Sequence, residues 1–141
     1  MRKSFVISIV LISALATIGA CTKSTTNLST GKPIATATVN NLTATLSNST
    51  GQLKSGDQEV TLAFTDSSGK NVDVGAVSLN FHMPAMGGMA AMNDAVTLTT
   101  TDTPGVYNGK VHISMAGEWQ GQLAFEGPAG KGKATFSATA R

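Results

Sequence analysis

The chain of 141 residues has a single cysteine, Cys21, and few aromatic side chains: five phenylalanines, one tyrosine and one tryptophan. A lone thiol cannot form an internal disulfide, and no second cysteine is present for a thiolate metal site. The sequence also lacks a G-x-S-x-G nucleophile motif, a phosphate-binding loop and paired carboxylates beside a histidine. An enzyme is therefore the poorest fit among the function classes, and we expect a protein that is not an enzyme.

Charged residues make up only 13% of the chain and are nearly balanced in sign. Of the ten Lys and Arg residues, Arg2 and Lys3 lie at the N-terminus, and the remaining eight match the eight Asp and Glu residues. No basic stripe with interleaved aromatic residues is present, so no nucleic acid is expected as a partner. No cluster of carboxylates suggests a calcium or magnesium site.

The N-terminus has the pattern of a secretory signal. Two basic residues precede an apolar run that starts at Phe5, and small residues lead up to Cys21. This arrangement resembles the lipobox of bacterial lipoproteins, and it implies a signal peptide at 1–20 and lipidation of Cys21. A polar tether at 21–33 and one folded domain at 34–141 follow. We expect a lipoprotein anchored to a membrane of the bacterial cell envelope, facing the periplasm or the exterior.

Apolar and polar residues alternate in the folded domain, and a period of two is typical of half-buried β-strands. Weaker strands are predicted at about 35–46, 95–100 and 133–139, with Gly- and Asp-containing turns between strands and no amphipathic helix. About seven short strands predict an all-β domain, an immunoglobulin-like antiparallel β-sandwich. The clearest apolar sets are Val60, Leu62 and Phe64; Val77, Leu79 and Phe81; Val111, Ile113 and Met115; and Trp119, Gly121, Leu123 and Phe125.

Four of the six methionines fall at three-residue intervals directly after one of the two histidines. Thioether sulfur is a soft donor that suits Cu(I), whereas zinc sites use cysteine, histidine and carboxylate. The pattern predicts a Cu(I) site. The candidate ligands are His82, Met83, Met86, Met89 and Met92.

The alternation of side chains along the predicted strand places the first two candidate ligands, His82 and Met83, on opposite faces. Met83 continues the inward face of its strand and His82 points outward, so the two can share a metal only if the chain leaves the sheet at Pro84. Residues 84–93 are predicted to form a loop that crosses one end of the sandwich, in which Met86, Met89 and Met92 converge. Two other interpretations stay open: the loop caps the end of the core, or it is an adaptable contact surface for a partner protein.

Two further residues have less specific interpretations. His112 lies on the outward face of a predicted strand, where a histidine is usually only solvated; it matters for the site only if that strand passes beside 82–92. Trp119 is expected to anchor the core rather than to cover a metal.

Three short motifs give a resemblance to a known family. Phe81 to Met86, then Gly105 to Tyr107, then Met115 to Trp119 resemble the YtkA-like domain, which is related to the FixH family, over about residues 55–140. The resemblance implies an immunoglobulin-like envelope domain associated with copper handling or heavy-metal efflux. The family pattern carries over to these positions: Met83, Pro84, Met86, Tyr107, Gly117 and Trp119.

The expected function is a lipid-anchored envelope protein that binds Cu(I) or Ag(I) and buffers the metal, transfers it or supports its efflux. Copper is the expected cofactor, and the partners are the membrane and an envelope metal-efflux or copper-delivery protein. The alternative is a module without metal that docks on an envelope transporter or adaptor.

Overall fold

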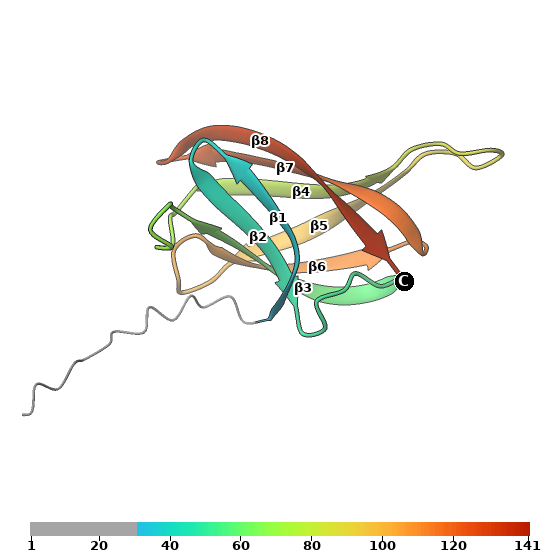
Figure 1. Cartoon of the computed structure of the whole chain (residues 1–141), viewed down its shortest axis with the longest axis horizontal. Helices are drawn as coiled ribbons and strands as arrows, with labels where there is room; N and C mark the ends of the chain where they lie inside the picture. The colour runs from blue at the N-terminus through green and yellow to red at the C-terminus, as the bar shows by residue number, and fades with distance from the viewer. Residues whose placement is uncertain (1–30) are drawn as a thin grey trace, which may run out of the picture.

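The computed structural model describes residues 31–141, so the predicted signal peptide, the predicted lipidation site Cys21 and most of the predicted tether lie outside it. The described residues form eight strands and no helix, and therefore no helix that could span a membrane (Figure 1). The predicted all-β class is confirmed, with one strand more than the expected seven or so. The strands are β1 (Lys32–Val39), β2 (Leu42–Asn48), β3 (Gly56–Thr65), β4 (Ala76–Met83), β5 (Met92–Thr100), β6 (Val106–Ile113), β7 (Gly117–Gly127) and β8 (Gly130–Ala140).

The eight strands form one antiparallel sheet in the order β1-β2-β3-β6-β5-β4-β7-β8. β5 links the two halves, because its first residues, up to Val96, pair with β4 and its last ones, from Thr97, pair with β6. The edge strands β1 and β8 lie against each other, so the sheet curls into a nearly closed, flattened barrel (Figure 1). This arrangement agrees with the predicted sandwich-like architecture.

The N-terminal hairpin differs from the prediction of one weak strand at about 35–46. β1 begins at Lys32, two residues before the predicted domain, and a tight turn separates it from β2. Asn40 and Asn41 form that turn with φ values of 49° and 67°. Two consecutive residues with positive φ are typical of a type I′ turn, which matches the twist of a two-residue hairpin, and asparagine tolerates this conformation better than most residues.

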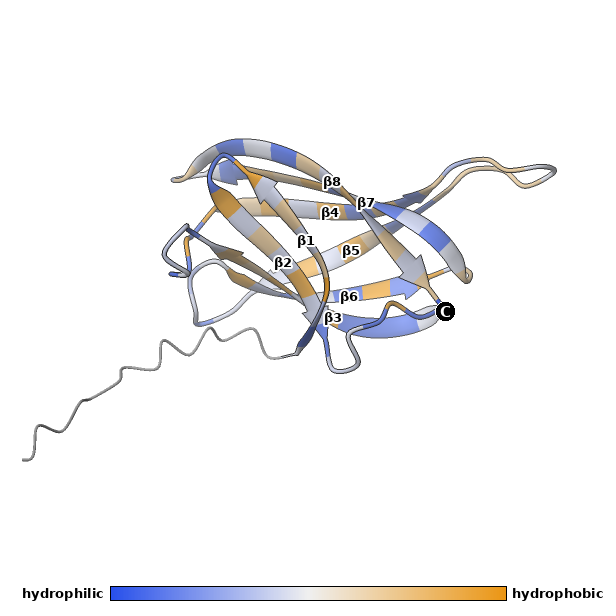
Figure 2. Ribbon diagram, viewed as in Figure 1, coloured by the Kyte–Doolittle hydropathy of each residue, from blue (hydrophilic) through white to orange (hydrophobic). Residues whose placement is uncertain are grey.

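The core follows the predicted alternation along the strands. The apolar sets of β3, β6 and β7 are buried, and in Figure 2 hydrophobic and hydrophilic residues alternate along several strands. Only Val77 of β4 and Met115, which lies just beyond β6, are partly buried among these sets. The largest fully buried side chains are Trp119, Phe64, Phe81, Leu46, Leu53 and Leu62.

A glycine on β7 lets two aromatic rings meet across the sheet. Gly121 pairs with Phe81 of β4 on one side and with Phe136 of β8 on the other. The two rings make an edge-to-face contact with centroids 6.2 Å apart. A Cβ added to Gly121 would lie 2.3 Å from the ring of Phe136, so only glycine fits without displacing that ring.

Two polar aromatic residues tie loops to the barrel. The Tyr107 hydroxyl at the start of β6 donates a hydrogen bond to the Gly75 carbonyl, 2.8 Å away, just before β4. The Trp119 indole of β7 donates to the Met115 carbonyl at 3.0 Å, and its side chain is 1% exposed. Trp119 is thus a core anchor, as predicted.

Replacing Gly121→Ala should lower the free energy of unfolding by about 1–3 kcal/mol, because the added methyl group displaces the Phe136 ring. Urea unfolding followed by tryptophan fluorescence measures the change. Gly88→Ala is the matched control, since a Cβ there meets nothing within 4 Å, and it should change stability by less than about 0.5 kcal/mol. Equal effects of the two substitutions would contradict the packing argument.

The stability of the protein should fall in alkaline buffer through Tyr107. Burial, together with the negative charge of Asp73, raises the pKa of Tyr107 above its ordinary value of 10.0. The unfolded chain therefore loses this proton first, and stability that is complete below about pH 10 declines as the pH rises toward the folded pKa.

Tyr107→Phe should cost about 0.5–1.5 kcal/mol at neutral pH through the lost hydrogen bond. Its deficit relative to the natural protein should shrink between about pH 9 and 11 in urea titrations; a constant deficit would contradict the assignment.

Candidate metal site

The connection between β4 and β5 is a hairpin that extends beyond the barrel. Residues 84–91, which we call the arm, project from the rest of the molecule (Figure 1). All eight are exposed, and none has a polar side chain. The prediction of a loop crossing one end of the sandwich was therefore wrong, because the two chain segments pair with each other instead of folding over the core.

The tip of the arm is a two-residue turn between two methionines. The Met86 amide donates to the Met89 carbonyl at 3.2 Å, and the Met89 amide donates to the Met86 carbonyl at 2.9 Å. Gly87 has a φ of +55°, whereas Gly88 is not in the positive range. Glycine with positive φ at the first central position is typical of a type II′ turn, which suits a tight hairpin. Met86 and Met89 are thus direct cross-strand neighbours.

The arm keeps the register of the β4–β5 ladder. Met83 pairs with Met92 at the base, and three residues further along Met86 pairs with Met89. Side chains alternate between the two faces of a paired strand, so positions three apart lie on opposite faces. Met83 and Met92 therefore belong to the inward face, and Met86 and Met89 belong to the outward face that also carries His82.

Exposure agrees with this division. The side chains of Met86 and Met89 are 56% and 47% exposed, and they are the exposed large hydrophobic residues of the region 31–141. Neither of them plugs the end of the barrel, so the cap interpretation does not hold for the tip. Since burying a methionine is worth about 1.5–3 kcal/mol, leaving two in water forgoes a sizeable stabilisation.

The two methionines at the base of the arm belong to the core. Met83 is 2% exposed, and its methyl group lies so close to Gly117 that a Cβ added there would be 2.9 Å away. Met92 is partly buried against the same core. Nearby, Asp94 accepts hydrogen bonds from the Ser114 amide and hydroxyl at 2.7 and 2.9 Å, which ties β5 to the β6–β7 turn. The structure therefore separates Met83 and Met92 from the tip pair.

His82 lies on the outward face at the base of the arm. Its Nδ1 is 2.9 Å from the side-chain oxygen of Asn93, its cross-strand neighbour on β5. The same oxygen accepts a hydrogen bond from the Asn80 amide at 3.2 Å. His82 and Met86 are four positions apart in extended chain, about 13 Å between backbones, so the imidazole is not beside the thioether pair. The methionine spacing does not reveal Asn80 and Asn93, although a hairpin centred on Gly87-Gly88 pairs His82 with Asn93.

The chemistry of the tip favours a soft ion. Cross-strand neighbours have Cβ atoms about 4.5–5.5 Å apart, and the long unbranched side chains of methionine can bring two sulfurs to one ion. Elsewhere in residues 31–141, His, Asp and Glu side chains do not gather in groups of three that could hold a metal ion. The tip offers thioether donors only.

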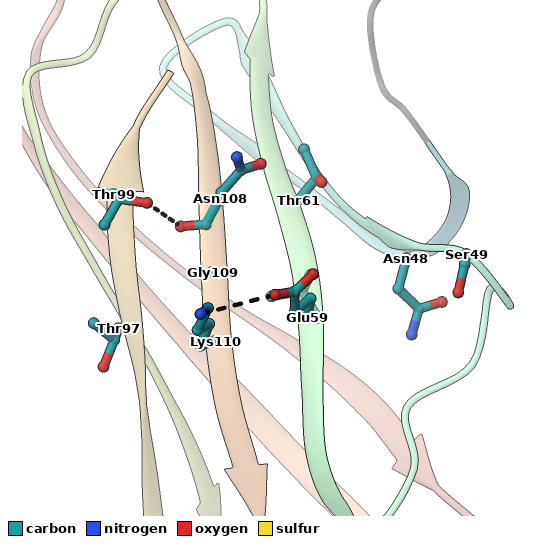
Figure 3. A pocket seen from close by; sticks show the side chains of 10 residues that line it. Asn48, Ser49, Glu59, Thr61, Thr97, Thr99, Asn108, Gly109 and Lys110 are labelled. Atoms are coloured by element: carbon teal, nitrogen blue, oxygen red, sulfur yellow. Dashed lines mark hydrogen bonds and ion pairs between the residues drawn. The ribbon is translucent and has the colours of Figure 1, made fainter.

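The outer face of β3, β6 and β5 carries a depression with a largely polar lining. Thr97, Thr99 and Asn108 line it, with a Lys110–Glu59 ion pair at 3.9 Å (Figure 3). Both charged side chains are about four-fifths exposed, so the pair contributes little.

His112 lies on that same outer face, near the β3–β6 pairing. Its Nδ1 is 2.9 Å from an Asp57 carboxylate oxygen. The pair is exposed to solvent, as predicted for a strand histidine. β5 lies between β6 and β4, so the strand carrying His112 does not run beside His82.

The motif residues behind the family resemblance differ in what they contact. Tyr107 and Trp119 make the hydrogen bonds described above, and Gly117 leaves room for the Met83 methyl group. Pro84 and Met86 are the exceptions, because both are exposed and neither belongs to the core or packs against it. Their presence in the motif has no explanation in the stability of the barrel.

Gly87→Ala should loosen the tip without destabilising the barrel. An L-residue at a φ of +55° costs about 1–2 kcal/mol, which should accelerate hydrogen exchange of the Met86 and Met89 amides about tenfold. Gly88→Ala should leave both exchange rates unchanged, and neither variant should alter the global free energy of unfolding. Equal rates in the two variants, measured by NMR, would contradict the turn assignment.

Comparison with known proteins identifies the family. Searches among curated proteins and among solved structures gave no significant match. A family model described as YtkA-like matches residues 28–124, which include β1 to β6 and most of β7. The match begins earlier and ends earlier than the predicted resemblance at about 55–140. Because it covers more than half of the sequence, the chain belongs to the YtkA-like family.

Proposed function

We propose that this protein is a lipid-anchored component of the bacterial cell envelope that binds Cu(I) or Ag(I) at the tip of the arm. The observation that carries the proposal is the thioether pair of Met86 and Met89, which lie opposite each other and are exposed in a domain that otherwise buries its large apolar side chains. The protein would buffer the metal, transfer it or support its efflux, without catalysing a reaction.

The choice of metal follows from the donor atoms. Thioethers are soft and uncharged, and they select monovalent copper over zinc or the alkaline-earth ions. They also need no deprotonation to bind, so the contribution of the tip should persist in mildly acidic conditions. Among the five candidate ligands, the geometry supports Met86 and Met89 most strongly. Met83 and Met92 support the arm from inside the core, and His82 supplies a nitrogen donor at its base.

The placement of the tip suits exchange with a partner. Two thioethers leave coordination positions of Cu(I) open, and the tip contacts no other part of the barrel, so a copper-delivery or efflux protein can approach the ion. Lipidation of Cys21 would hold the domain at a membrane, with residues 21–31 as the connection to β1. This part of the proposal depends on the lipobox pattern alone.

A protein-interaction module without metal is the second candidate. It is favoured by the composition of the arm, which exposes eight consecutive residues without a polar side chain. Exposed apolar patches often mark contact sites, and methionine adapts well to a partner surface. The two candidates differ in one property, namely whether the isolated protein takes up Cu(I).

The double substitution Met86→Leu/Met89→Leu should abolish stoichiometric Cu(I) uptake and leave the free energy of unfolding within about 0.5 kcal/mol of the natural value. Leucine keeps the apolar volume and removes the sulfur. Anaerobic titration against a chromophoric chelator measures uptake, with Zn(II) as the control metal.

Met83→Leu is the matched control for this pair. It should retain Cu(I) uptake and lower the stability by up to about 1.5 kcal/mol, because Met83 is buried. Normal uptake by the double variant would remove the tip as the site. No uptake by the natural protein would leave the interaction module as the better function.

A further inference from the structure

We propose that Asn93 is a positioning residue that holds the neutral imidazole of His82 with its proton on Nδ1, so that Nε2 is presented as a metal-binding nitrogen. This inference rests on the proposed function, since it names a donor group for the same class of soft ion at the base of the arm, apart from the thioether pair at the tip. A hydrogen-bond network on the outward face of β4 and β5 joins Asn80, His82 and Asn93.

The direction of the hydrogen bonds follows from the acceptor. The Asn93 carbonyl oxygen accepts from the Asn80 amide at 3.2 Å, and a carbonyl oxygen has no proton to donate. The Nδ1 atom of His82 lies 2.9 Å from this same oxygen, so with the Asn93 amide in this orientation Nδ1 is the donor. A neutral imidazole has one N–H, and Nε2 then carries the free lone pair.

The Nε2 atom is available to a ligand. Among residues 31–141 it has no hydrogen-bond partner, while Nδ1 is engaged. Free neutral histidine in water prefers to carry its proton on Nε2, so Asn93 reverses the ordinary preference. Hydrogen bonds from the non-ligating nitrogen are how proteins orient metal-binding imidazoles and select their tautomer.

The position of His82 gives the arm two donor groups on one face. His82 and Met86 are four residues apart, with Pro84 between them, and even spacing puts them on the same side of the extended chain. Asn93 and Met89 occupy the matching positions on the other segment. The thioether pair at the tip and the imidazole at the base are therefore lined up along the outward face, about 13 Å apart along the backbone.

The test is nitrogen NMR of the full chain with isotope-labelled histidine at about pH 9, where an ordinary histidine is neutral. The second histidine provides an internal reference, because Nδ1 of His112 faces a carboxylate oxygen of Asp57, which can only accept. His112→Gln assigns the two sets of signals. His82 is expected to show the same protonated-Nδ1 pattern as His112.

Two variants test the role of Asn93. Asn93→Leu should move the His82 proton to Nε2, and Asn93→Asp, which keeps an acceptor oxygen, should restore the Nδ1 pattern; His112 should not change in either. Asn93 is exposed, so these substitutions do not disturb the core. A proton on Nε2 of His82 in the natural protein, or the same pattern in Asn93→Leu, would overturn the positioning role.

Addition of Ag(I) separates this inference from the proposed function. The His82 Nε2 signal should shift in the natural protein and lose that shift in Asn93→Leu, while the Met86 and Met89 methyl signals shift in both. Methyl shifts without any shift of His82 Nε2 would overturn only the imidazole donor. Absent methyl shifts would overturn the tip as a metal site, whatever the tautomer of His82.

Discussion

Alternation of side chains along the β4–β5 ladder decides where each methionine of the hairpin lies. The register that pairs Met83 with Met92 continues to the pair Met86 and Met89, and the spacing of three residues carries the second pair to the other face. One sequence pattern therefore produces two different environments. A shift of β5 by one residue against β4 would move Met92 from the inner to the outer face.

The barrel gives the arm a firm base. Gly121 of β7 leaves room for the contact between the rings of Phe81 on β4 and Phe136 on β8. Asp94 of β5 accepts hydrogen bonds from Ser114 in the turn after β6. Dense packing of this kind resists local displacement. The tip has only its two turn hydrogen bonds and no core contacts, so rigidity declines along the arm from the base to Gly87 and Gly88.

Much of the fold could be predicted because burial leaves a period of two in the sequence. The phases of β3, β6 and β7 and the core position of Trp119 follow from it. The division of 35–46 into β1 and β2 depends on two asparagines adopting positive φ, a local preference that hydrophobic alternation does not reveal.

The candidate site could be predicted only in part. Spacing and softness of the donors make the methionines candidate ligands, but their separation into inner and outer pairs requires the hairpin register. The role of Asn93 depends on a cross-strand neighbour eleven residues away in sequence. Interpreting Gly87-Gly88 as a two-residue turn predicts both the methionine pairs and the pairing of His82 with Asn93, because such a turn sets which residues face each other.

The isolation of the arm tip from the barrel also bears on how the protein can change over generations. Substitutions in a core alter the fraction of unfolded protein and thereby the amount that survives proteolysis in a cell. Residues 84–91 contribute no such packing, since all of them are exposed. Variation at the tip is therefore constrained little by protein abundance, and residues 84–91 can change while the domain that carries them stays the same.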